Sequence, residues 1–218
     1  MKDRDIYKVI ELLEEEFSQW KVPIVTEIAQ AERSPFKVLI STVLSLRTKD
    51  ETTREASMRL FALAETPADM SNLSPEQIEK AIYPAGFYKS KARNILKICR
   101  KLVDAYHSEV PEELEQLLEF PGVGRKTANL VLTLGHGLPG ICVDTHVHRI
   151  TNRLGYVNTG TPEETEFALR RKLPKQFWVP INDLLVSYGQ NLCRPVSPYC
   201  SRCRIFRYCD RSGVDKSR

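Results

Sequence analysis

The sequence predicts an all-α protein with two lobes, and three observations carry this prediction. Apolar residues recur at helical spacing along most of the chain, whereas the strict alternation of a half-buried strand hardly appears. Ser-Pro and Thr-Pro pairs mark helix starts at Ser34, Ser74 and Thr161. The breaker-rich segment 135–140, GHGLPG, indicates a boundary between lobes, and a second boundary is expected near Pro23.

The first predicted helix lies near the amino terminus. Its buried stripe follows the spacing i, i+3, i+4, i+7 and i+11 and consists of Ile6, Val9, Ile10, Leu13 and Phe17. A second helix begins at Pro35 with Ser34 as its N-cap, and its inward positions are Phe36, Leu39, Ile40, Val43 and Leu44. Ser74 and Thr161 each precede Pro and are followed three residues later by Gln or Glu, the form of a capping box.

A further helix is predicted to begin near Ser90. Its apolar positions are Ala92, Ile95, Leu96, Cys99, Leu102, Val103 and Tyr106. On the opposite side runs a basic stripe of Lys89, Arg93, Lys97 and Arg100. Such a helix can pack on a core and contact a phosphate backbone at the same time.

Composition is that of an ordinary globular protein, but the basic residues are clustered. Lys and Arg number 32 against 28 Asp and Glu, with 42% apolar and 28% charged residues. Segment 89–102 is basic without an acidic residue, and segment 193–218 is also strongly basic. This indicates a polyanion footprint, with solvated faces as the alternative. No stretch approaches the roughly 20 apolar residues of a membrane span, and no secretory signal is evident, so we expect an intracellular protein.

Four cysteines close the chain in the pattern C-x6-C-x2-C-x5-C: Cys193, Cys200, Cys203 and Cys209. Four thiolates can hold either a tetrahedral zinc ion or a [4Fe–4S] cluster. The usual zinc signature has two C-x2-C pairs, and only one is present here, so the longer arms favour the cluster. A disulfide framework is disfavoured by the expected compartment. Cys99 and Cys142 lie in apolar runs and are predicted to be small buried residues.

Residues 111–134 are predicted to form a helix, a tight turn and a second helix. The helices are expected over Glu112–Phe120 and Arg125–Leu134. Between them, Gly122 and Gly124 allow positive φ and a close backbone approach, and the second helix presents unpaired N–H groups at its start. Such a turn can bind a phosphate, although helix–turn–helix connections without a ligand also use Gly-x-Gly.

Two residues are candidates for a chemical role: one lies just after this turn and the other just after the breaker-rich segment 135–140. Lys126 lies in the first turn of a helix, where the helix dipole and partial burial favour its neutral, nucleophilic form. A phosphate-binding lysine is the alternative. Asp144 is expected to be the N-cap of a helix beginning at Thr145.

Three segments resemble one family. Residues 117–132, LLEFPGVGRKTANLVL, resemble the helix–hairpin–helix of the endonuclease III family of DNA glycosylases. Residues 143–155, VDTHVHRITNRLG, resemble its aspartate segment after the Gly/Pro-rich loop, and the cysteine tail is similar to its [4Fe–4S] motif. Weaker similarity, through SKARNILKICRKL, extends the resemblance over most of the chain.

The resemblance implies a two-lobed helix–hairpin–helix DNA glycosylase fold. Residues 28–137 would form its six-helix domain, and residues 1–27 with 138–218 its [4Fe–4S] cluster domain. The implied activity is base excision repair by a DNA glycosylase and abasic-site lyase acting on oxidised pyrimidines. Its partner would be double-stranded DNA containing damaged bases or abasic sites; we expect a monomer in the cytoplasm or nucleoid of a prokaryote, with no membrane contact.

The resemblance also assigns catalytic roles, in a cleft expected between the lobes. Lys126 would attack C1′ of the damaged nucleotide, expel the base and lead through an imine to strand cleavage by β-elimination. Asp144 would stabilise the developing oxocarbenium charge and assist the lysine. Cys193, Cys200, Cys203 and Cys209 would bind the cluster.

Other residues are expected to contact DNA. The hairpin contributes Gly122, Val123, Gly124 and Arg125, and the start of the basic helix contributes Lys89 and Lys91. Phe87 matches the position of an inserted apolar residue, with a core aromatic as the alternative. Arg47 stands where family members often have glutamine, and Asp50 is expected to orient that loop or to cap the next helix.

Two competing hypotheses remain at this point. A monofunctional mismatch glycosylase of the same superfamily is disfavoured by Lys126, since those relatives commonly lack a lysine there. A non-catalytic, zinc-stabilised DNA-binding module would also explain the basic stripe, the hairpin and the four cysteines.

Overall fold

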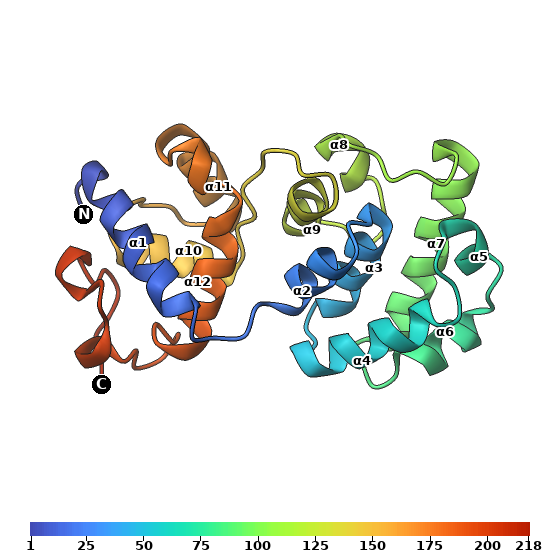
Figure 1. The fold of residues 1–218 in the computed structure, drawn as a ribbon, viewed down its shortest axis with the longest axis horizontal. Helices are drawn as coiled ribbons and strands as arrows, with labels where there is room; N and C mark the ends of the chain where they lie inside the picture. The colour runs from blue at the N-terminus through green and yellow to red at the C-terminus, as the bar shows by residue number, and fades with distance from the viewer. The chain divides into compact units, whose positions relative to one another are not determined.

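The computed structural model describes all residues, 1–218, and contains helices and loops without a β-strand. The predicted all-α class is therefore confirmed. The chain forms two compact units, one of Met1–Pro23 with Ile141–Arg218 and the other of Ile24–Gly140 (Figure 1). No helix is both long enough and apolar enough to cross a bilayer.

The unit Ile24–Gly140 is built around a buried central helix. Its helices are α2 (Ile24–Ala31), α3 (Pro35–Ser45), α4 (Asp50–Phe61), α5 (Pro67–Ser71), α6 (Pro75–Ile82), α7 (Tyr88–Tyr106), α8 (Leu114–Leu118), α9 (Arg125–Leu130) and the π-helical segment η2 (Val131–Gly135). Helix α3 is buried from Phe36 to Leu44 and packs against α2, α4, α7 and α9. An apolar α3 at the centre thus fixes the elements around it.

Helix starts in this unit follow the predicted caps. Ser34 accepts a hydrogen bond from the Lys37 amide at 3.2 Å. Ser74 and Gln77 form the reciprocal capping box, with bonds of 3.2 and 2.8 Å. Both satisfy amide groups that would otherwise lack partners in the first turn.

Helix α7 begins at Tyr88, two residues before the predicted start, and keeps the predicted two-sided character. Ala92, Ile95, Cys99 and Leu102 are fully buried, whereas Lys89, Arg93, Lys97 and Arg100 are exposed. Val103 and Tyr106 are only half-buried. The basic stripe is therefore available to a polyanion while the opposite side anchors the helix.

The second unit combines both ends of the chain. Its helices are α1 (Ile6–Phe17), α10 (Thr145–Arg153), α11 (Pro162–Lys172) and α12 (Pro180–Asn191), with short 3-10 turns at Asp3–Asp5, Lys175–Phe177, Cys200–Arg202 and Phe206–Tyr208. Helices α1 and α10 both pack against α12 (Figure 1). The predicted α1 stripe is buried from Ile6 to Leu13, with Phe17 half-buried.

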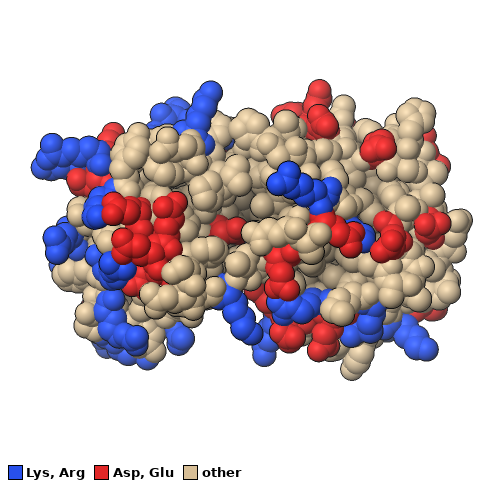
Figure 2. All heavy atoms as spheres, viewed as in Figure 1, with Lys and Arg blue, Asp and Glu red and all other residues tan.

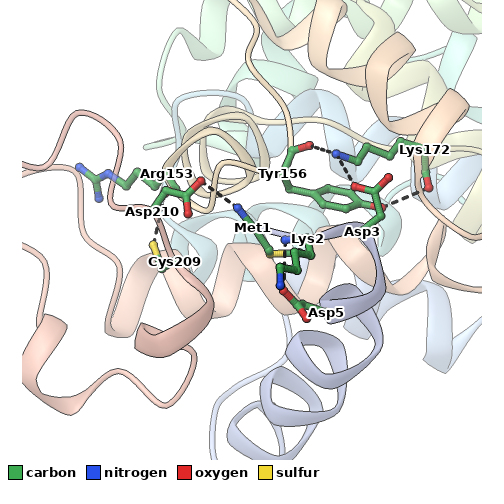
Figure 3. Close-up of polar contacts among 9 residues, drawn as sticks. All are labelled: Met1, Lys2, Asp3, Asp5, Arg153, Tyr156, Lys172, Cys209 and Asp210. Carbon is green, nitrogen blue, oxygen red and sulfur yellow. Dashed lines mark hydrogen bonds and ion pairs between the residues drawn. The ribbon is translucent and has the colours of Figure 1, made fainter.

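Polar contacts join the amino-terminal residues to remote parts of this unit (Figure 3). The amino group of Met1 pairs with Asp210 at 2.8 Å, and Asp3 pairs with Lys172 at 2.8 Å. Lys172 also donates to the carbonyl of Tyr156 at 2.7 Å, and the Tyr156 hydroxyl donates back to the Lys172 carbonyl at 3.1 Å. These bonds connect the residues just before α1 to Asp210 in the carboxyl-terminal segment and to Lys172 at the end of α11.

One predicted cap differs in detail. Thr161 accepts from the Glu164 amide at 3.1 Å, as expected for an N-cap. The Glu164 carboxylate, however, accepts from the Gly160 amide at 2.8 Å instead of that of Thr161. Thr161 caps α11, but the predicted reciprocal box is wrong because Glu164 reaches one residue further back.

Candidate nucleic-acid interface and cluster site

The predicted hairpin connects α8 to α9, and its two glycines differ. Gly122 has φ 80°, and an added Cβ there would lie 2.8 Å from the side-chain nitrogen of Asn94 on α7. Gly124 has φ −103° in extended backbone, and nothing lies within 4 Å of its Cβ position. Both glycines allow positive φ, but only Gly122 adopts it. The first helix is also shorter than predicted, beginning at Leu114.

The hairpin is held by one buried side chain, and its two glycines are exposed to solvent. Val123 is 6% exposed and belongs to the core of the unit Ile24–Gly140. Gly122 and Gly124, on either side of it, are exposed. Arg125 and Lys126 begin α9 and are half-buried. A buried valine thus holds two exposed glycine backbones at the surface, an arrangement that admits a close approach by another backbone.

Asp144 is the N-cap of α10, as predicted. Its backbone is extended, and Oδ1 accepts hydrogen bonds from the amides of His146 at 2.8 Å and Val147 at 2.9 Å. The residue is 9% exposed. Two capping bonds fix the orientation of the carboxylate. Asp144 belongs to the unit formed by both chain ends, and Lys126 to the unit Ile24–Gly140.

The structure brings Arg47 and Phe87 together. The Arg47 guanidinium lies over the Phe87 ring, 5.5 Å from its centroid. Both residues have left-handed backbone, with φ of 52° and 58°, and both are exposed. Phe87 is 63% exposed, so the alternative of a core aromatic is wrong. The two loops form one exposed surface with an aromatic ring and a cation.

Lys91 is placed differently from the expectation of a DNA contact. It is 6% exposed, and its Nζ donates to the carbonyls of Leu44 and Leu46 at 2.6 and 2.7 Å and to the Thr48 hydroxyl at 2.8 Å. Three intramolecular acceptors occupy the three N–H donors of an ammonium group, so a direct phosphate contact does not fit. Lys89, in the first turn of α7, is exposed as expected.

Asp50 is the first residue of α4, and the cap position belongs to Lys49. The expectation that Asp50 caps this helix is therefore off by one residue. An exposed carboxylate in the first turn still stabilises the helix through its dipole.

The four carboxyl-terminal cysteines line one cavity. Cys193 follows α12, Cys200 begins a 3-10 turn that Cys203 follows, and Cys209 lies just beyond the next 3-10 turn. All four thiols are free of disulfides and half-buried. Apolar neighbours form much of the wall: Ile150, Leu154, Leu192 and Ile205. Burial raises the pKa of the Cys209 thiol to about 11.

Two polar side chains face the sulfurs. The Tyr188 hydroxyl donates to Cys203 Sγ at 3.1 Å, and Arg153 Nη1 donates to Cys193 Sγ at 3.4 Å. The Cys209 thiol lies 3.3 Å from the Arg153 carbonyl (Figure 3). Hydrogen-bond donors around thiolates are the outer contacts that a metal centre needs. No group of three or more His, Cys, Asp or Glu side chains is arranged for a single metal ion. Four thiols that line one cavity, with hydrogen-bond donors at two of them, have the chemistry of a thiolate-ligated metal centre.

Sequence reasoning missed Tyr188 and Arg153. Neither lies in the cysteine motif: Tyr188 is on α12 and Arg153 is the last residue of α10. A buried tyrosine shortly before a metal-ligating cysteine carries no distinctive pattern. Only the packing of α10 and α12 around the cavity reveals both residues.

Basic residues gather over the carboxyl-terminal segment, beside an acidic patch over α1 (Figure 2). Arg204 pairs with Glu15 of α1 at 2.5 Å. This arginine therefore attaches the cysteine segment to α1. Arg202 and Arg207 are exposed.

The fold and the hairpin between α8 and α9 together define the class: an all-helical, helix–hairpin–helix protein. Residues 40–175 match the family described as HhH-GPD superfamily base excision DNA repair protein. Endonuclease III of Thermotoga maritima is 50% identical over 179 residues, covering 82% of this chain and 84% of that protein. Endonuclease III of Escherichia coli K12 is 39% identical over 177 residues, covering 81% and 84%. The chain therefore belongs to the endonuclease III family within this superfamily.

The fold agrees with that membership. A solved trapped endonuclease III–DNA covalent intermediate, an estranged-adenine complex, superposes with a TM-score of 0.86. It shares 34% sequence identity, and the alignment covers 97% of each chain. A thermostable thymine-DNA glycosylase, at 21% identity and a TM-score of 0.73, shares the fold alone.

Proposed function

We propose that this chain removes oxidised pyrimidines from duplex DNA with Lys126 as its nucleophile. As a member of the endonuclease III family it is a base excision repair enzyme, a DNA glycosylase and abasic-site lyase. Its partner is duplex DNA carrying damage. The single observation that carries the assignment of the nucleophile is the place of Lys126, in the first turn of α9 directly after the hairpin Pro121–Gly124.

The proposed reaction has two stages. The neutral Lys126 amine forms a bond to C1′ while the C1′–N bond breaks and the base leaves with the bonding electrons and a proton. The nitrogen lone pair then forms the C1′=N double bond of a protonated imine while the C1′–O4′ bond breaks and O4′ takes up a proton from solvent. This imine makes a C2′ proton acidic, and its removal expels the 3′ phosphate by β-elimination. A similar chain, trapped in a covalent intermediate with DNA, supports a covalent step in the reaction.

We propose that Asp144 acts on the same substrate as an electrostatic group. Its capping bonds to His146 and Val147 fix the carboxylate in one orientation. A carboxylate so fixed can stabilise positive charge that develops on the sugar and accept the proton that Lys126 releases. Capping and catalysis are compatible because a carboxylate that accepts amide hydrogen bonds keeps its negative charge.

The proposed cofactor is a [4Fe–4S] cluster held by Cys193, Cys200, Cys203 and Cys209. When bound, the cluster supplies a covalent cross-link between four points of the segment after α12, and no bond cleavage is assigned to it. Support comes from the cavity that all four cysteines line and from the hydrogen-bond donors at two of them. We further propose residues 1–27 and 138–218 as the cluster domain and residues 28–137 as the six-helix domain.

The proposed DNA contacts come from the hairpin, the two loops and the basic stripe. The hairpin residues are Gly122, Val123, Gly124 and Arg125. Phe87 is proposed to fill the gap left by the extruded base, and Arg47 to face the opposite strand. Lys89 would contact phosphates from the start of α7. The enzyme would work as a monomer wherever the cell keeps its DNA.

A borohydride trap tests the nucleophile. We expect wild-type protein to form a covalent adduct with abasic duplex DNA, and Lys126→Gln to form none, because glutamine cannot make the imine. An adduct that survives Lys126→Gln, or a wild type without any adduct, would overturn the proposal. The second outcome would favour a monofunctional glycosylase, in which water attacks the sugar.

The metal has its own test. A purified protein containing about four iron atoms per chain, with broad visible absorption, is expected. A colourless protein with one zinc ion per chain would favour the zinc-stabilised DNA-binding module.

A further inference from the structure

Lys91 joins two loops that are far apart in the sequence. Its ammonium group binds the end of α3 and the loop after it through three acceptors: Leu44 O, Leu46 O and Thr48 Oγ1. The Leu44 and Leu46 carbonyls lie at the carboxyl-terminal end of α3, where a helix leaves its carbonyls unpaired. Lys91 supplies these carbonyls with a donor from α7.

The Thr48 hydroxyl extends this network to the second loop. It accepts a hydrogen bond from the Gly86 amide at 3.1 Å, next to Phe87. The backbones are in close contact here, because a Cβ on Gly86 would lie 2.5 Å from the Arg47 carbonyl oxygen. Lys91, Thr48 and Gly86 therefore hold the segments 44–48 and 85–87 against one another.

Arg47 and Phe87 need such support. Each has left-handed backbone, a conformation that is unfavourable for a residue other than glycine. A strained conformation persists only where the surroundings hold it. Arg59 of α4 adds a further support by donating to the Ala81 and Tyr83 carbonyls at 2.8 and 2.5 Å.

The position of Lys91 is unusual for a lysine. It is surrounded by the core of the unit Ile24–Gly140, and burial lowers its pKa to about 8. A purely apolar residue would pack there without this cost. Near neutral pH the ammonium form still predominates, and all three of its N–H groups have acceptors.

We propose that Lys91 is a positioning residue for lesion recognition. It holds segment 44–48, which carries Arg47, and segment 85–87, which carries Phe87, as one pre-organised surface that contacts the duplex. The inference rests on the proposed function for its substrate, duplex DNA with a damaged base. Lys91 itself touches no DNA in this account. It acts through Thr48 and the backbone, so that the two exposed side chains enter the base stack together.

Lys91→Met tests this role, since methionine keeps most of the apolar length and removes the donors. Base removal from a lesion duplex under single-turnover conditions is expected to fall by about tenfold or more. Borohydride trapping on a single-stranded abasic oligonucleotide needs no base extrusion, and its rate is expected to stay within about twofold.

Lys37→Met is the matched control. Lys37 is also buried in this unit, 8% exposed, but its ammonium pairs with Glu32 and Glu65, away from both loops. We expect it to lower stability without separating the two rates. A second pair of variants leaves both lysines in place and changes Thr48. Thr48→Val should reproduce the effect of Lys91→Met, whereas Thr48→Ser, which keeps the hydroxyl, should behave like the wild type.

Amide hydrogen exchange gives a readout independent of catalysis. In Lys91→Met, exchange is expected to accelerate at Gly86 and in residues 44–48 together, and in Lys37→Met at neither. Unchanged exchange in both loops, or equal loss of the duplex and single-strand rates, would overturn the proposal. A wild type that forms no adduct with abasic DNA would instead count against the proposed function, and the exchange result would still decide the role of Lys91.

Discussion

The hydroxyl of Tyr188 donates a 3.1 Å hydrogen bond to the sulfur of Cys203, one of the four cysteines proposed to bind the cluster. Tyr188 is 1% exposed, and its ring packs edge-on against Trp20 with centroids 5.7 Å apart. A buried phenol hydroxyl needs a hydrogen-bond acceptor, and the sulfur of Cys203 is the acceptor here. The bond therefore links the packing of α12 to the cysteine cavity.

Tyr188→Phe should weaken retention of the cluster. Removing the hydroxyl takes away one donor to a ligand sulfur and costs about 1 kcal/mol in the free energy of unfolding. The visible absorption should decay faster in the variant when a chelator and air are present. Tyr156→Phe is the control, because it also loses one buried hydrogen bond, to the Lys172 carbonyl, without touching sulfur. Equal decay in both variants would argue against a role for the Tyr188 bond.

The two hairpin glycines should respond differently to alanine. Gly122→Ala is expected to lower the free energy of unfolding by about 1–2 kcal/mol, because its φ is positive and its Cβ would press on Asn94. Gly124→Ala should change stability by less than about 0.5 kcal/mol, since its Cβ meets nothing. Chemical denaturation measures both.

Gly124→Ala should weaken DNA binding, although it hardly changes stability. A methyl group on this exposed backbone would hinder the approach of a DNA phosphate. The loss of one hydrogen bond between backbone and phosphate corresponds to an increase of about fivefold in Kd. Fluorescence anisotropy with abasic duplex DNA measures it. Undiminished affinity in a fully folded Gly124→Ala protein would exclude a close backbone contact at this position.

Two substitutions separate the capping role of Asp144 from its proposed chemistry. Asp144→Ala removes the acceptor of the His146 and Val147 amides and should cost about 1 kcal/mol of stability. Asp144→Asn keeps an oxygen acceptor and should be nearly as stable as wild type. Both are expected to lose base-removal activity, because neither carries the charge. An active Asp144→Asn enzyme would reduce Asp144 to a helix cap.

Cys99 should make stability depend on alkaline pH. Burial raises the pKa of its thiol from 9.0 to about 12. Between these values the folded protein keeps the proton and the unfolded chain has lost it, so unfolding releases a proton and stability falls as pH rises. The effect approaches 1.4 kcal/mol per pH unit. Cys99→Ala should lack this loss of stability with rising pH. The difference in the free energy of unfolding between wild type and variant should therefore narrow from pH 9 to 11. A constant difference would contradict a raised pKa at Cys99.

Much of the fold could be predicted because its signals are local. Ser34, Ser74 and Asp144 cap helices through bonds to amides two or three residues away, and the structure contains all three. The α1 stripe is set by helical spacing alone. Interactions over a few residues depend little on the rest of the chain, so sequence suffices for them.

The tertiary structure decided the features that depend on remote segments. Lys91 belongs by sequence to a basic stretch, yet its ammonium lies inside the unit Ile24–Gly140 because Leu44, Leu46 and Thr48 offer acceptors there. The same is true of Tyr188, whose donor role exists only because Cys203, 15 residues later, folds back onto α12. No pattern of residue spacing predicts a hydrogen bond between such distant segments.

The sequence by itself determined the helical class, the caps, the hairpin and the family resemblance, since each rests on residues close together in the chain. Only the tertiary structure decided which lysine is buried, which glycine takes positive φ and which side chains face the cysteines. Burial and hydrogen-bond partners are properties of segments brought together by packing, and local sequence does not specify that packing.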